Sequence, residues 1–263
     1  SCAVMADHSL KCWGNDWNGQ VGHNVSGGWH STPFPTTMPN GLTAIQSAAG
    51  LHTSCAIMDD YSLWCWGDND PQGQVGIGNT SQGNIAIPQQ IDLPPNRTAI
   101  SVVYGHDYGC AILDNGDGMC WGDNQGAQLG DGTTENRSSP TLISLVPQSR
   151  RLVAIDVGFQ TTCGILDNGS VLCWGRNDVG QFGDGTLTNY SSTVSRYAIL
   201  PVGRVAVSIS VGQYHACAIL DNGDAFCWGS NELGQLGDES TTDRSTPSRV
   251  SMPEGSVVST ISA

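Results

Sequence analysis

Ten cysteines carry the most evident chemistry in this chain of 263 residues. They occur as five pairs, with nine residues between the two members of a pair and Trp-Gly directly after the second member. Such thiols either form a disulfide or bind a metal, and zinc sites use much shorter spacings such as Cys-x-x-Cys. The spacing therefore predicts five local disulfides that leave no free thiol: Cys2–Cys12, Cys55–Cys65, Cys110–Cys120, Cys163–Cys173 and Cys217–Cys227.

Histidine and acidic side chains are the other groups that could catalyse a reaction or hold an ion. His52, His106 and His215 precede the nearest cysteine by three, four and two residues, so they do not form a set of equivalent ligands. The acids of 114–117 and 221–224 lie between apolar runs, where Asp and Asn suit turn geometry, and calcium binding there is the alternative. The sequence contains no nucleophile elbow, His-Glu-x-x-His motif or phosphate loop. We therefore predict no catalytic residue, no metal site and no cofactor, and hence no enzyme.

Asparagines in the context Asn-x-Ser/Thr are acceptors for N-linked glycans. The chain has six of them: Asn24, Asn79, Asn96, Asn136, Asn168 and Asn189. Asn24, Asn79, Asn136 and Asn189 lie 22 to 26 residues beyond the first cysteine of their repeat. Their placement predicts glycans on equivalent loops, although polar loops rich in Asn, Ser and Thr also create such triplets by composition alone.

Tryptophans fall into a regular and an irregular group. One Trp follows the second cysteine in every repeat, and this regularity is typical of packing between repeats. Trp17, Trp29 and Trp64 break the pattern, and all three belong to the first two repeats. Exposed aromatic residues in loops are frequent contact residues, so these three are the predicted interface, with simple packing as the alternative.

Short strands and tight turns must position these residues. Residues 205–211 alternate apolar and small polar side chains, as a half-buried strand does. Two apolar runs then flank Asp-Asn-Gly at 221–223, a hairpin signal in which glycine takes the left-handed position of a three-residue loop. This register places Cys217 opposite Cys227 at a non-hydrogen-bonded pair, with Cα atoms about 4.5–5.5 Å apart, a separation that a disulfide bridges. One register thus explains all five pairs.

A larger period organises these hairpins. The first cysteines of the pairs lie 53, 55, 53 and 54 residues apart, and a Gly-Gln-rich turn and a Pro-containing stretch follow each hairpin. Four short strands per period describe a propeller blade. We therefore predict an all-β fold, a β-propeller of five four-stranded blades with a disulfide in each, as one domain over 1–263. The blades are approximately 1–44 (completed by 257–263), 45–98, 99–151, 152–204 and 205–256.

Composition restricts the partners. The net charge is −14, with 24 acidic and 10 basic residues. Nucleic-acid binding depends on Lys and Arg that neutralise phosphates, so this balance opposes it. Apolar runs are shorter than the roughly 18 residues that a membrane helix needs, which argues against membrane insertion. Dense disulfides indicate an oxidising compartment, so we predict a secreted or cell-surface protein.

The run 207–241 resembles the repeat of the regulator of chromosome condensation family in its hairpin, its Trp-Gly-x-Asn motif and its Gly-Gln-Leu-Gly turn. The resemblance covers essentially the whole chain and implies a β-propeller, which in that family usually has seven blades. The family spans nucleotide exchange factors, a plant ultraviolet-B photoreceptor and β-lactamase inhibitors, so it does not imply one function. The nuclear members of the family lack such cysteine pairs, and docking to chromatin would need a basic surface that this acidic chain does not supply. The resemblance to the photoreceptor would imply Trp residues in the turn before the second strand, and the matching turns of this chain contain no Trp.

The two ends of the chain look complementary. Residues 257–263 match the pattern of the strand at 152–158 that precedes a hairpin, and Cys2 opens a hairpin that such a strand should precede. The last strand is therefore predicted to complete the first blade and close a ring of five. Completion of a first blade in a neighbouring copy, and a chain that is one segment of a longer protein, are the open alternatives.

Together these features predict a non-catalytic extracellular propeller with a structural or adhesive role. It is expected to be glycosylated and to bind a protein or glycan partner, with self-association into a fibre or surface assembly as one form of this role. The alternative is a secreted propeller that binds one specific protein or glycan ligand on a face, as an inhibitor or a lectin does.

Overall fold

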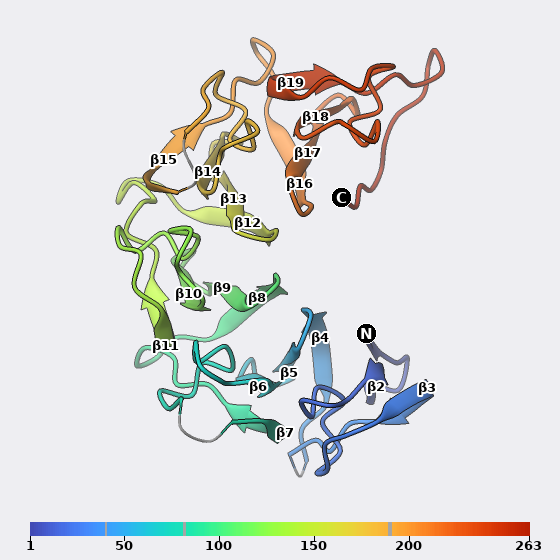
Figure 1. The fold of residues 1–263 in the computed structure, drawn as a ribbon, viewed down its shortest axis with the longest axis vertical. Helices are drawn as coiled ribbons and strands as arrows, with labels where there is room; N and C mark the ends of the chain where they lie inside the picture. Colours follow the sequence, from blue (N-terminus) through green and yellow to red (C-terminus); the bar gives the residue numbers. More distant parts are fainter. Residues whose placement is uncertain (40, 81–82, 189–190) are drawn as a thin grey trace. The chain divides into compact units, whose positions relative to one another are not determined.

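The structure is a computed structural model that describes residues 1–39, 41–80, 83–188 and 191–263. These residues form nineteen strands in five antiparallel sheets that follow one another along the chain (Figure 1). The first sheet has three strands: β1 (Cys2–Val4), β2 (Leu10–Asn15) and β3 (Trp29–Pro35). No helix that could span a lipid bilayer occurs in the described part of the chain.

Each of the other four sheets has four strands in sequence order. The second consists of β4 (Ala44–Ala49), β5 (Thr53–Met58), β6 (Leu63–Gly67) and β7 (Ile85–Gln90). The third consists of β8 (Ala99–Tyr104), β9 (Tyr108–Leu113), β10 (Gly118–Gly122) and β11 (Arg137–Leu142). The fourth consists of β12 (Leu152–Val157), β13 (Thr161–Leu166), β14 (Val171–Gly175) and β15 (Ser192–Tyr197). The fifth consists of β16 (Ala206–Val211), β17 (His215–Leu220), β18 (Ala225–Gly229) and β19 (Arg244–Arg249).

The cysteines lie opposite each other in every central hairpin. Cys217 pairs with Cys227 in the β17–β18 ladder, and Ala218 pairs with Phe226, as the hairpin register predicted. The five disulfides join the predicted partners, with Cα atoms 4.0–4.2 Å apart. The prediction of an all-β fold with one disulfide in each blade is confirmed.

The Trp-Gly that follows each second cysteine forms a bulge. In all five blades the register between the strand that ends in Trp-Gly and the next strand shifts between the cysteine and this glycine. Gly67, for example, has φ +117°, and a Cβ there would lie 2.3 Å from the carbonyl oxygen of His52. Glycine is therefore required by both its backbone angle and the close approach of the neighbouring strand.

The bulge directs four of the regular tryptophans into the interior, where Trp66, Trp121, Trp174 and Trp228 are fully buried. The indole N–H of Trp66 donates to the carbonyl oxygen of Gln20 at 2.9 Å, and that of Trp228 donates to Gln181 at 2.7 Å. Each acceptor belongs to the Gly-Gln turn of the preceding blade. This bond satisfies the buried N–H and links one blade to the next in these cases. The indole nitrogen of Trp121 is also buried but has no hydrogen-bond partner among the described residues.

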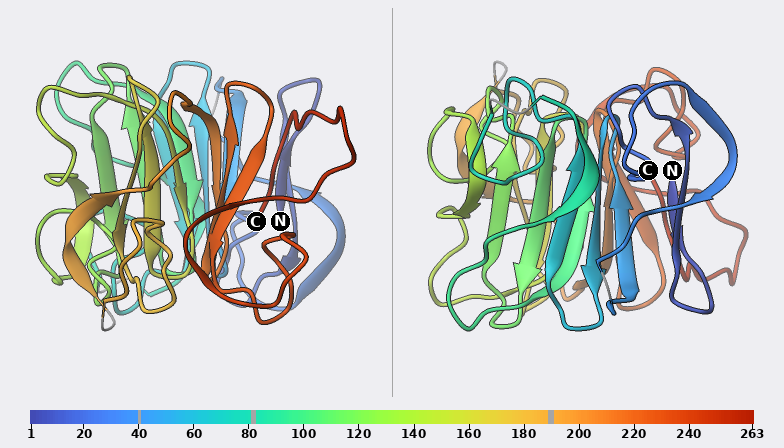
Figure 2. Two further views of the ribbon diagram at one scale, coloured as in Figure 1. Left: turned by 90° about the horizontal axis from the view of Figure 1, so that it is seen from above. Right: turned by 90° about the horizontal axis from the view of Figure 1, so that it is seen from below.

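The chain divides into two compact units. The first comprises Ser1–Asn124 and Glu135–Leu142, and the second comprises Gln125–Thr134 and Ile143–Ala263. Figure 2 shows the twisted antiparallel sheets from two further directions. Within the first unit β4 and β5 contact β8, and within the second unit β12 and β13 contact β16. Neighbouring blades thus meet through their first two strands.

Side chains on the first strands reinforce this contact. In the first unit the amide of Gln46 donates to the carbonyl oxygen of Val102 and accepts from its N–H, both at 3.2 Å. In the second unit Val211 donates its N–H to the carboxylate of Asp156 at 2.7 Å. Burial raises the pKa of Asp156. In both units a polar side chain on the first strand of one blade therefore joins it to the next blade, at positions that differ by two residues along the strand.

The C-terminal segment 257–263 forms no strand. It belongs to the second unit, where Val258 donates its N–H to the carbonyl oxygen of Gly223 at 2.9 Å. Ala263 donates its N–H to the hydroxyl of Ser210 at 3.0 Å. The described first sheet therefore has three strands, and completion of the first blade by 257–263 stays a prediction.

Candidate interaction site

Trp17 lies on the loop between β2 and β3 with an exposed side chain, at 58% of its full accessibility. The backbone of this loop is closed at its base, since Asp16 donates its N–H to Gly28 at 3.1 Å and accepts the N–H of Gly27. Trp17 itself donates its N–H to the side chain of Asn15 at 2.9 Å. These bonds hold the loop against the end of β2, so the indole is displayed on an ordered segment.

Trp29 is the first residue of β3 and is 71% exposed. It pairs with Asn15 in the β2–β3 ladder, directly across from the residue whose side chain holds Trp17. The exposed side chains of Val25 and Phe34 lie on the same loop and strand. Because exposed Trp residues are enriched among the residues that dominate binding energy, the sequence segment 17–34 is the candidate surface.

Trp64, the third predicted interface residue, has a different environment. It lies on β6 and is only partly exposed, packed against the main core cluster of the first unit. Its indole N–H donates to the hydroxyl of Ser62 at 2.8 Å. The structure therefore places Trp17 and Trp29 near the two ends of the β2–β3 connection, whereas Trp64 lies on β6 in the second blade.

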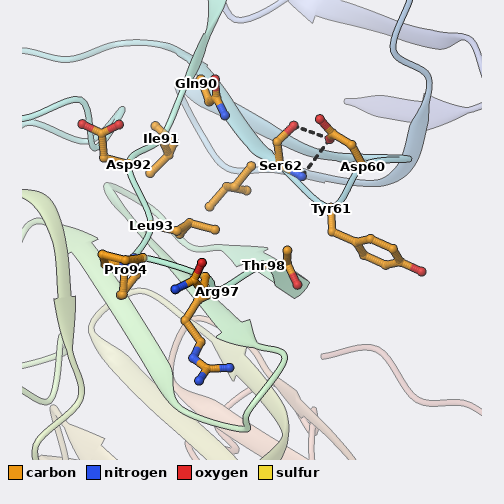
Figure 3. Close-up of a pocket in the computed structure, with 13 residues that line it drawn as sticks. Asp60, Tyr61, Ser62, Gln90, Ile91, Asp92, Leu93, Pro94, Arg97 and Thr98 are labelled. Atoms are coloured by element: carbon orange, nitrogen blue, oxygen red, sulfur yellow. Dashed lines mark hydrogen bonds between the residues drawn. The ribbon is translucent and has the colours of Figure 1, made fainter.

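A shallow groove of about 390 Å³ lies beside the second blade. Figure 3 shows its lining, with the hairpin turn at Asp60 and Tyr61 on one side and the segment 90–98 on the other. Asp60 accepts hydrogen bonds from the backbone and hydroxyl of Ser62, which fixes the turn. Asn96, one of the glycan acceptors, also lines the groove and is exposed, so a glycan there would occupy its edge.

The histidines that were considered at the sequence level do not come together. His52 and His106 lie in turns before β5 and β9, and His106 contacts the carboxylate of its neighbour Asp107 at 2.6 Å. His215 is the first residue of β17, and burial lowers its pKa. No arrangement of these three forms a ligand set among the residues that the structure describes.

The first acid of each of these two hairpin turns is paired with an arginine. Arg97 contacts Asp114 at 3.0 Å, and Arg204 contacts Asp221 at 3.3 Å. Asp114 and Asp221 also accept backbone N–H groups. These carboxylates therefore serve turn geometry and exposed ion pairs, each worth about 0–1 kcal/mol, and the described residues hold no calcium-type cluster at these turns.

The glycan acceptors lie mostly on exposed positions. Exposed side chains are found at Asn24, Asn96, Asn136 and Asn168, Asn79 is half-buried, and Asn189 lies outside the described residues. The side-chain oxygen of Asn136 accepts the backbone N–H of Asn124 at 2.8 Å. Asp243 does the same for Asn231 at 2.7 Å in the fifth blade. This loop position therefore has a structural role of its own, and glycosylation stays a prediction.

One cluster of chemically active side chains was missed at the sequence level. Asp16, His23 and His30 offer ligand atoms that all lie within 4.8 Å of one another. A signal for it existed in the repeats: the Trp-Gly-x-Asn motif has Asp16 in place of Asn in the first repeat only. His23 and His30 follow in the same repeat, 7 and 14 residues later.

Five successive antiparallel sheets, each with one disulfide, define a bladed all-β repeat protein. A family model described as the RCC1-like domain matches residues 1–263. The chain belongs to this family, and the predicted resemblance to regulator of chromosome condensation repeats is confirmed.

Individual relatives agree with this assignment. The ultraviolet-B receptor UVR8 of Arabidopsis thaliana is 26% identical over 277 residues, which cover 100% of this chain and 60% of the relative. The fold is similar to that of yeast RCC1 (Prp20) in its complex with Kap60, with a TM-score of 0.85, 20% identity and coverage of 100% of this chain and 63% of that chain. The ectodomain of the Physcomitrella patens receptor kinase CR4 is similar with a TM-score of 0.53, 21% identity and coverage of 88% and 50%. The chain thus spans less than two thirds of the length of these relatives.

Proposed function

We propose that this chain is an extracellular, non-catalytic adhesion and interaction module that binds a partner protein through the surface around Trp17 and Trp29. The observation that carries the proposal is the loop closed at Asp16 and Gly28, since an exposed Trp directly follows each of these two closing residues. Trp residues in such positions supply much of the binding energy of protein interfaces.

The extracellular setting is supported by the five disulfides. Each joins residues ten positions apart, and all cysteines of the chain are used. Cytosolic and nuclear compartments keep thiols reduced, so disulfides at this density are typical of secreted and surface proteins. Exposed glycan acceptors such as Asn24 and Asn136 are compatible with the same route.

The partner is expected to be basic on its contacting face. The chain carries a net charge of −14, which attracts positive surfaces and raises association rates with them. RCC1 (Prp20), which shares the fold, is bound to Kap60 in its crystal structure. This supports a protein-binding role for the same type of blade in this chain, and such a role needs no catalytic residue.

A photo-reactive side chain at position 17 would identify the partner in native extracellular material, with the same group at Leu233 as a matched control. Leu233 is 91% exposed on the corresponding loop of the fifth blade. A partner that crosslinks at position 17 and not at 233 supports the proposal. Equal labelling at both positions, or none at 17, contradicts it.

Affinity measurements then separate the forms of the proposal. Trp17→Ala with Trp29→Ala should weaken binding at least about 30-fold, since the loss of one dominant contact already costs roughly 2 kcal/mol or more and 1.4 kcal/mol is tenfold. Leu233→Ala should leave affinity unchanged. Sedimentation of the isolated chain tests self-association, which the double variant should abolish if the partner is a second copy; a glycan array tests the lectin-like alternative.

A further inference from the structure

The first blade holds a carboxylate and two imidazoles at one point near the base of the loop that carries Trp17. Nδ1 of His23 lies 3.3 Å from Oδ2 of Asp16, and Nε2 of His30 lies 3.6 Å from the same oxygen. Asp16 is fully buried, and the two histidine side chains are only 12% and 22% exposed. Two nitrogen ligands and one oxygen ligand thus converge in a largely dry site.

The buried position of Asp16 is occupied by asparagine in the other four blades, at Asn69, Asn124, Asn177 and Asn231. There the side-chain amide has two partners. In the fourth blade Oδ1 of Asn177 accepts the N–H of Phe182 at 2.8 Å, and Nδ2 donates to the carbonyl oxygen of Thr186 at 3.1 Å. The amide therefore closes the loop that follows the hairpin, and a carboxylate could accept the first bond but not donate the second.

The fifth blade shows how the corresponding three positions are satisfied without an ion. Asn231 corresponds to Asp16, Asp238 to His23 and Arg244 to His30, the last pair through the ladder positions Gly229↔Arg244 and Gly14↔His30. Nδ2 of Asn231 donates to Oδ1 of Asp238 at 3.1 Å. Nε of Arg244 donates to Oδ2 of Asp238 at 2.7 Å. In the fifth blade the amide and the guanidinium both donate to the carboxylate, and the positive charge of Arg244 balances the negative charge of Asp238.

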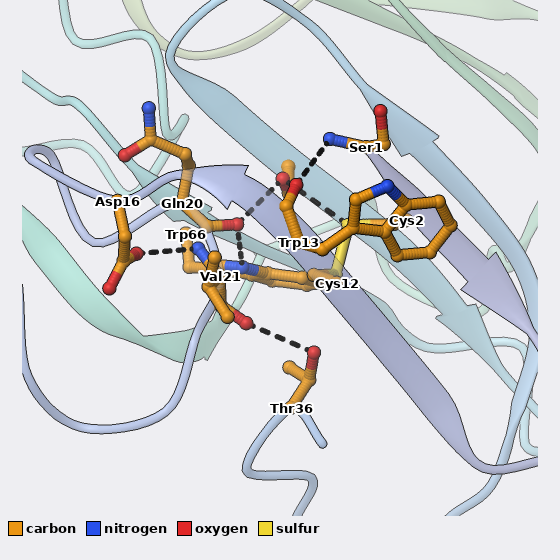
Figure 4. Close-up of a disulfide and its surroundings, with 10 residues drawn as sticks. Ser1, Cys2, Cys12, Trp13, Asp16, Gln20, Val21, Thr36 and Trp66 are labelled. Carbon is orange, nitrogen blue, oxygen red and sulfur yellow. Dashed lines mark hydrogen bonds between the residues drawn. A yellow bond between two sulfur atoms is a disulfide. The ribbon is translucent and has the colours of Figure 1, made fainter. Parts of the chain in front are cut away.

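The first blade keeps only half of this arrangement. Val21 donates its N–H to Oδ1 of Asp16 at 2.8 Å, which orients the carboxylate, and Figure 4 shows Oδ2 directed away from this bond. Oδ2 of Asp16 and Nδ1 of His23 are buried and form no hydrogen bond with any residue that the structure describes. Since an uncompensated buried carboxylate is costly, the site calls for a positive charge between these atoms.

We propose that Asp16, His23 and His30 bind a zinc ion. A tetrahedral zinc ion with ligand bonds of about 2.0–2.2 Å requires ligand atoms roughly 3.4 Å apart. Two of the three separations are 3.3 and 3.6 Å, and the third is within 4.8 Å. The planes of the His23 and His30 rings are nearly perpendicular, at 84°. The centroid of the Phe34 ring lies 4.9 Å from that of His23 and 5.0 Å from that of His30. Phe34 therefore forms an apolar wall beside the ion.

The ligand set selects the metal class. Two imidazoles and one carboxylate suit zinc and related first-row ions, whereas calcium prefers six to eight oxygen ligands. Three protein ligands leave the fourth tetrahedral position for water or for a donor atom of a bound molecule. The hydrogen bond from Val21 to Asp16 plays the supporting role that outer groups play around metal-binding carboxylates.

Zinc binding is tested on the isolated chain with no polyhistidine tag, after treatment with a chelator and removal of the chelator. Calorimetric titration with zinc chloride should show one site per chain, and calcium chloride should show none. A thermal melt should move upward with zinc concentration, because an ion that binds only the folded state stabilises it. Neither measurement needs the partner protein. A negative result would therefore contradict the zinc site without bearing on the proposed binding surface around Trp17 and Trp29.

Three variants locate the site. Asp16→Asn installs the residue of the other four blades and should weaken zinc binding by more than the roughly 10- to 100-fold that changes outside the ligand set cost. His8→Asn changes an exposed histidine of the same blade, at a left-handed position that Asn tolerates, and should bind zinc as the wild type does. The triple variant D16N/H23D/H30R copies the fifth blade; it should fold, bind no zinc and melt independently of chelator.

Cobalt substitution gives a spectroscopic check that a purely structural role of these residues would not produce. Cobalt(II) should develop the visible absorption of a tetrahedral ion in the wild type and His8→Asn, and not in Asp16→Asn. Absence of zinc binding in the wild type would show that the cluster is only a carboxylate–histidine ion pair and would overturn the proposal. Unchanged zinc affinity in Asp16→Asn would also overturn it.

Discussion

Replacing Asn177 by aspartate should strongly destabilise the second unit. Asn177 is fully buried at the end of the β13–β14 hairpin. Its Oδ1 accepts the N–H of Phe182 at 2.8 Å, and its Nδ2 donates to the carbonyl oxygen of Thr186 at 3.1 Å and to the Thr186 hydroxyl at 3.4 Å. The substitution preserves the shape and the first bond but turns the donor into a charged oxygen that faces a carbonyl oxygen.

The cost follows from the loss of the donor and the burial of a charge. Leaving a buried charge without a partner typically costs about 3–5 kcal/mol. For a domain of 150–250 residues, 1 kcal/mol corresponds to about 2–4 °C in Tm, so the expected decrease is roughly 6–20 °C. Because burial raises the pKa of the new carboxyl above its unfolded value, near 3.9, the folded state holds a proton more tightly. The stability deficit of Asn177→Asp should therefore be largest at neutral pH and shrink as the pH falls.

Thermal unfolding followed by circular dichroism, without reductant and at several pH values, measures this effect. The matched control is Asp16→Asn, which makes the opposite change at the corresponding position of the first blade. In zinc-free protein this control should melt at or above the wild-type temperature, because it removes a buried carboxylate. A Tm for Asn177→Asp within about 2 °C of wild type at neutral pH, or a deficit that grows at lower pH, would refute the reasoning.

Three further substitutions test separate parts of the fold. Cys217→Ala with Cys227→Ala opens a loop of about 11 residues and should cost about 2.8 kcal/mol by the chain-entropy model, measured as a lower Tm under non-reducing conditions; an unchanged Tm would contradict the role of the staples. Gly158→Ala would place a Cβ 2.1 Å from the carbonyl oxygen of Gly212, so urea unfolding should show a loss of about 1–3 kcal/mol; full stability would mean that the blades separate easily. Hydrogen bonds from neighbouring hydroxyl and guanidinium groups hold the pKa of Asp238 well below its usual range. Ionised Asp238 therefore contributes its full stabilisation at pH values above the usual pKa of an aspartate, and this stabilisation is lost as the pH falls toward the lower pKa of the folded state. The Tm of Asp238→Asn should accordingly be lower than that of the wild type at neutral pH, and the difference should disappear in strong acid.

The repeated elements of the fold follow from the sequence alone. The Asp-Asn-Gly turn at 221–223 sets a hairpin register, and the register places Cys217 opposite Cys227, as the structure shows. The same local rule acts in all five repeats, so one correct hairpin predicts every disulfide. The Trp-Gly motif was recognisable as a packing element, but its physical basis, a bulge whose glycine approaches the neighbouring strand, required the three-dimensional arrangement.

The candidate sites were harder to predict because they depend on loops. Asp16 and His30 are 14 residues apart, and they meet only because the loop closes between Asp16 and Gly28. The sequence also grouped Trp64 with the two exposed tryptophans, although Trp64 is only partly exposed on β6 and packs against the core cluster of the first unit. Loop closure and side-chain direction are decided by tertiary contacts that a repeat pattern does not encode.

The state of the ten cysteines in native material tests the central claim most directly, since both the fold account and the extracellular setting depend on the five disulfides. Freshly isolated protein is denatured in the presence of an alkylating reagent, and its intact mass is compared with that of the same material alkylated after reduction. The account predicts no alkylation before reduction and ten alkylated cysteines afterwards. Alkylated cysteines in the unreduced native protein would show free thiols and contradict the account.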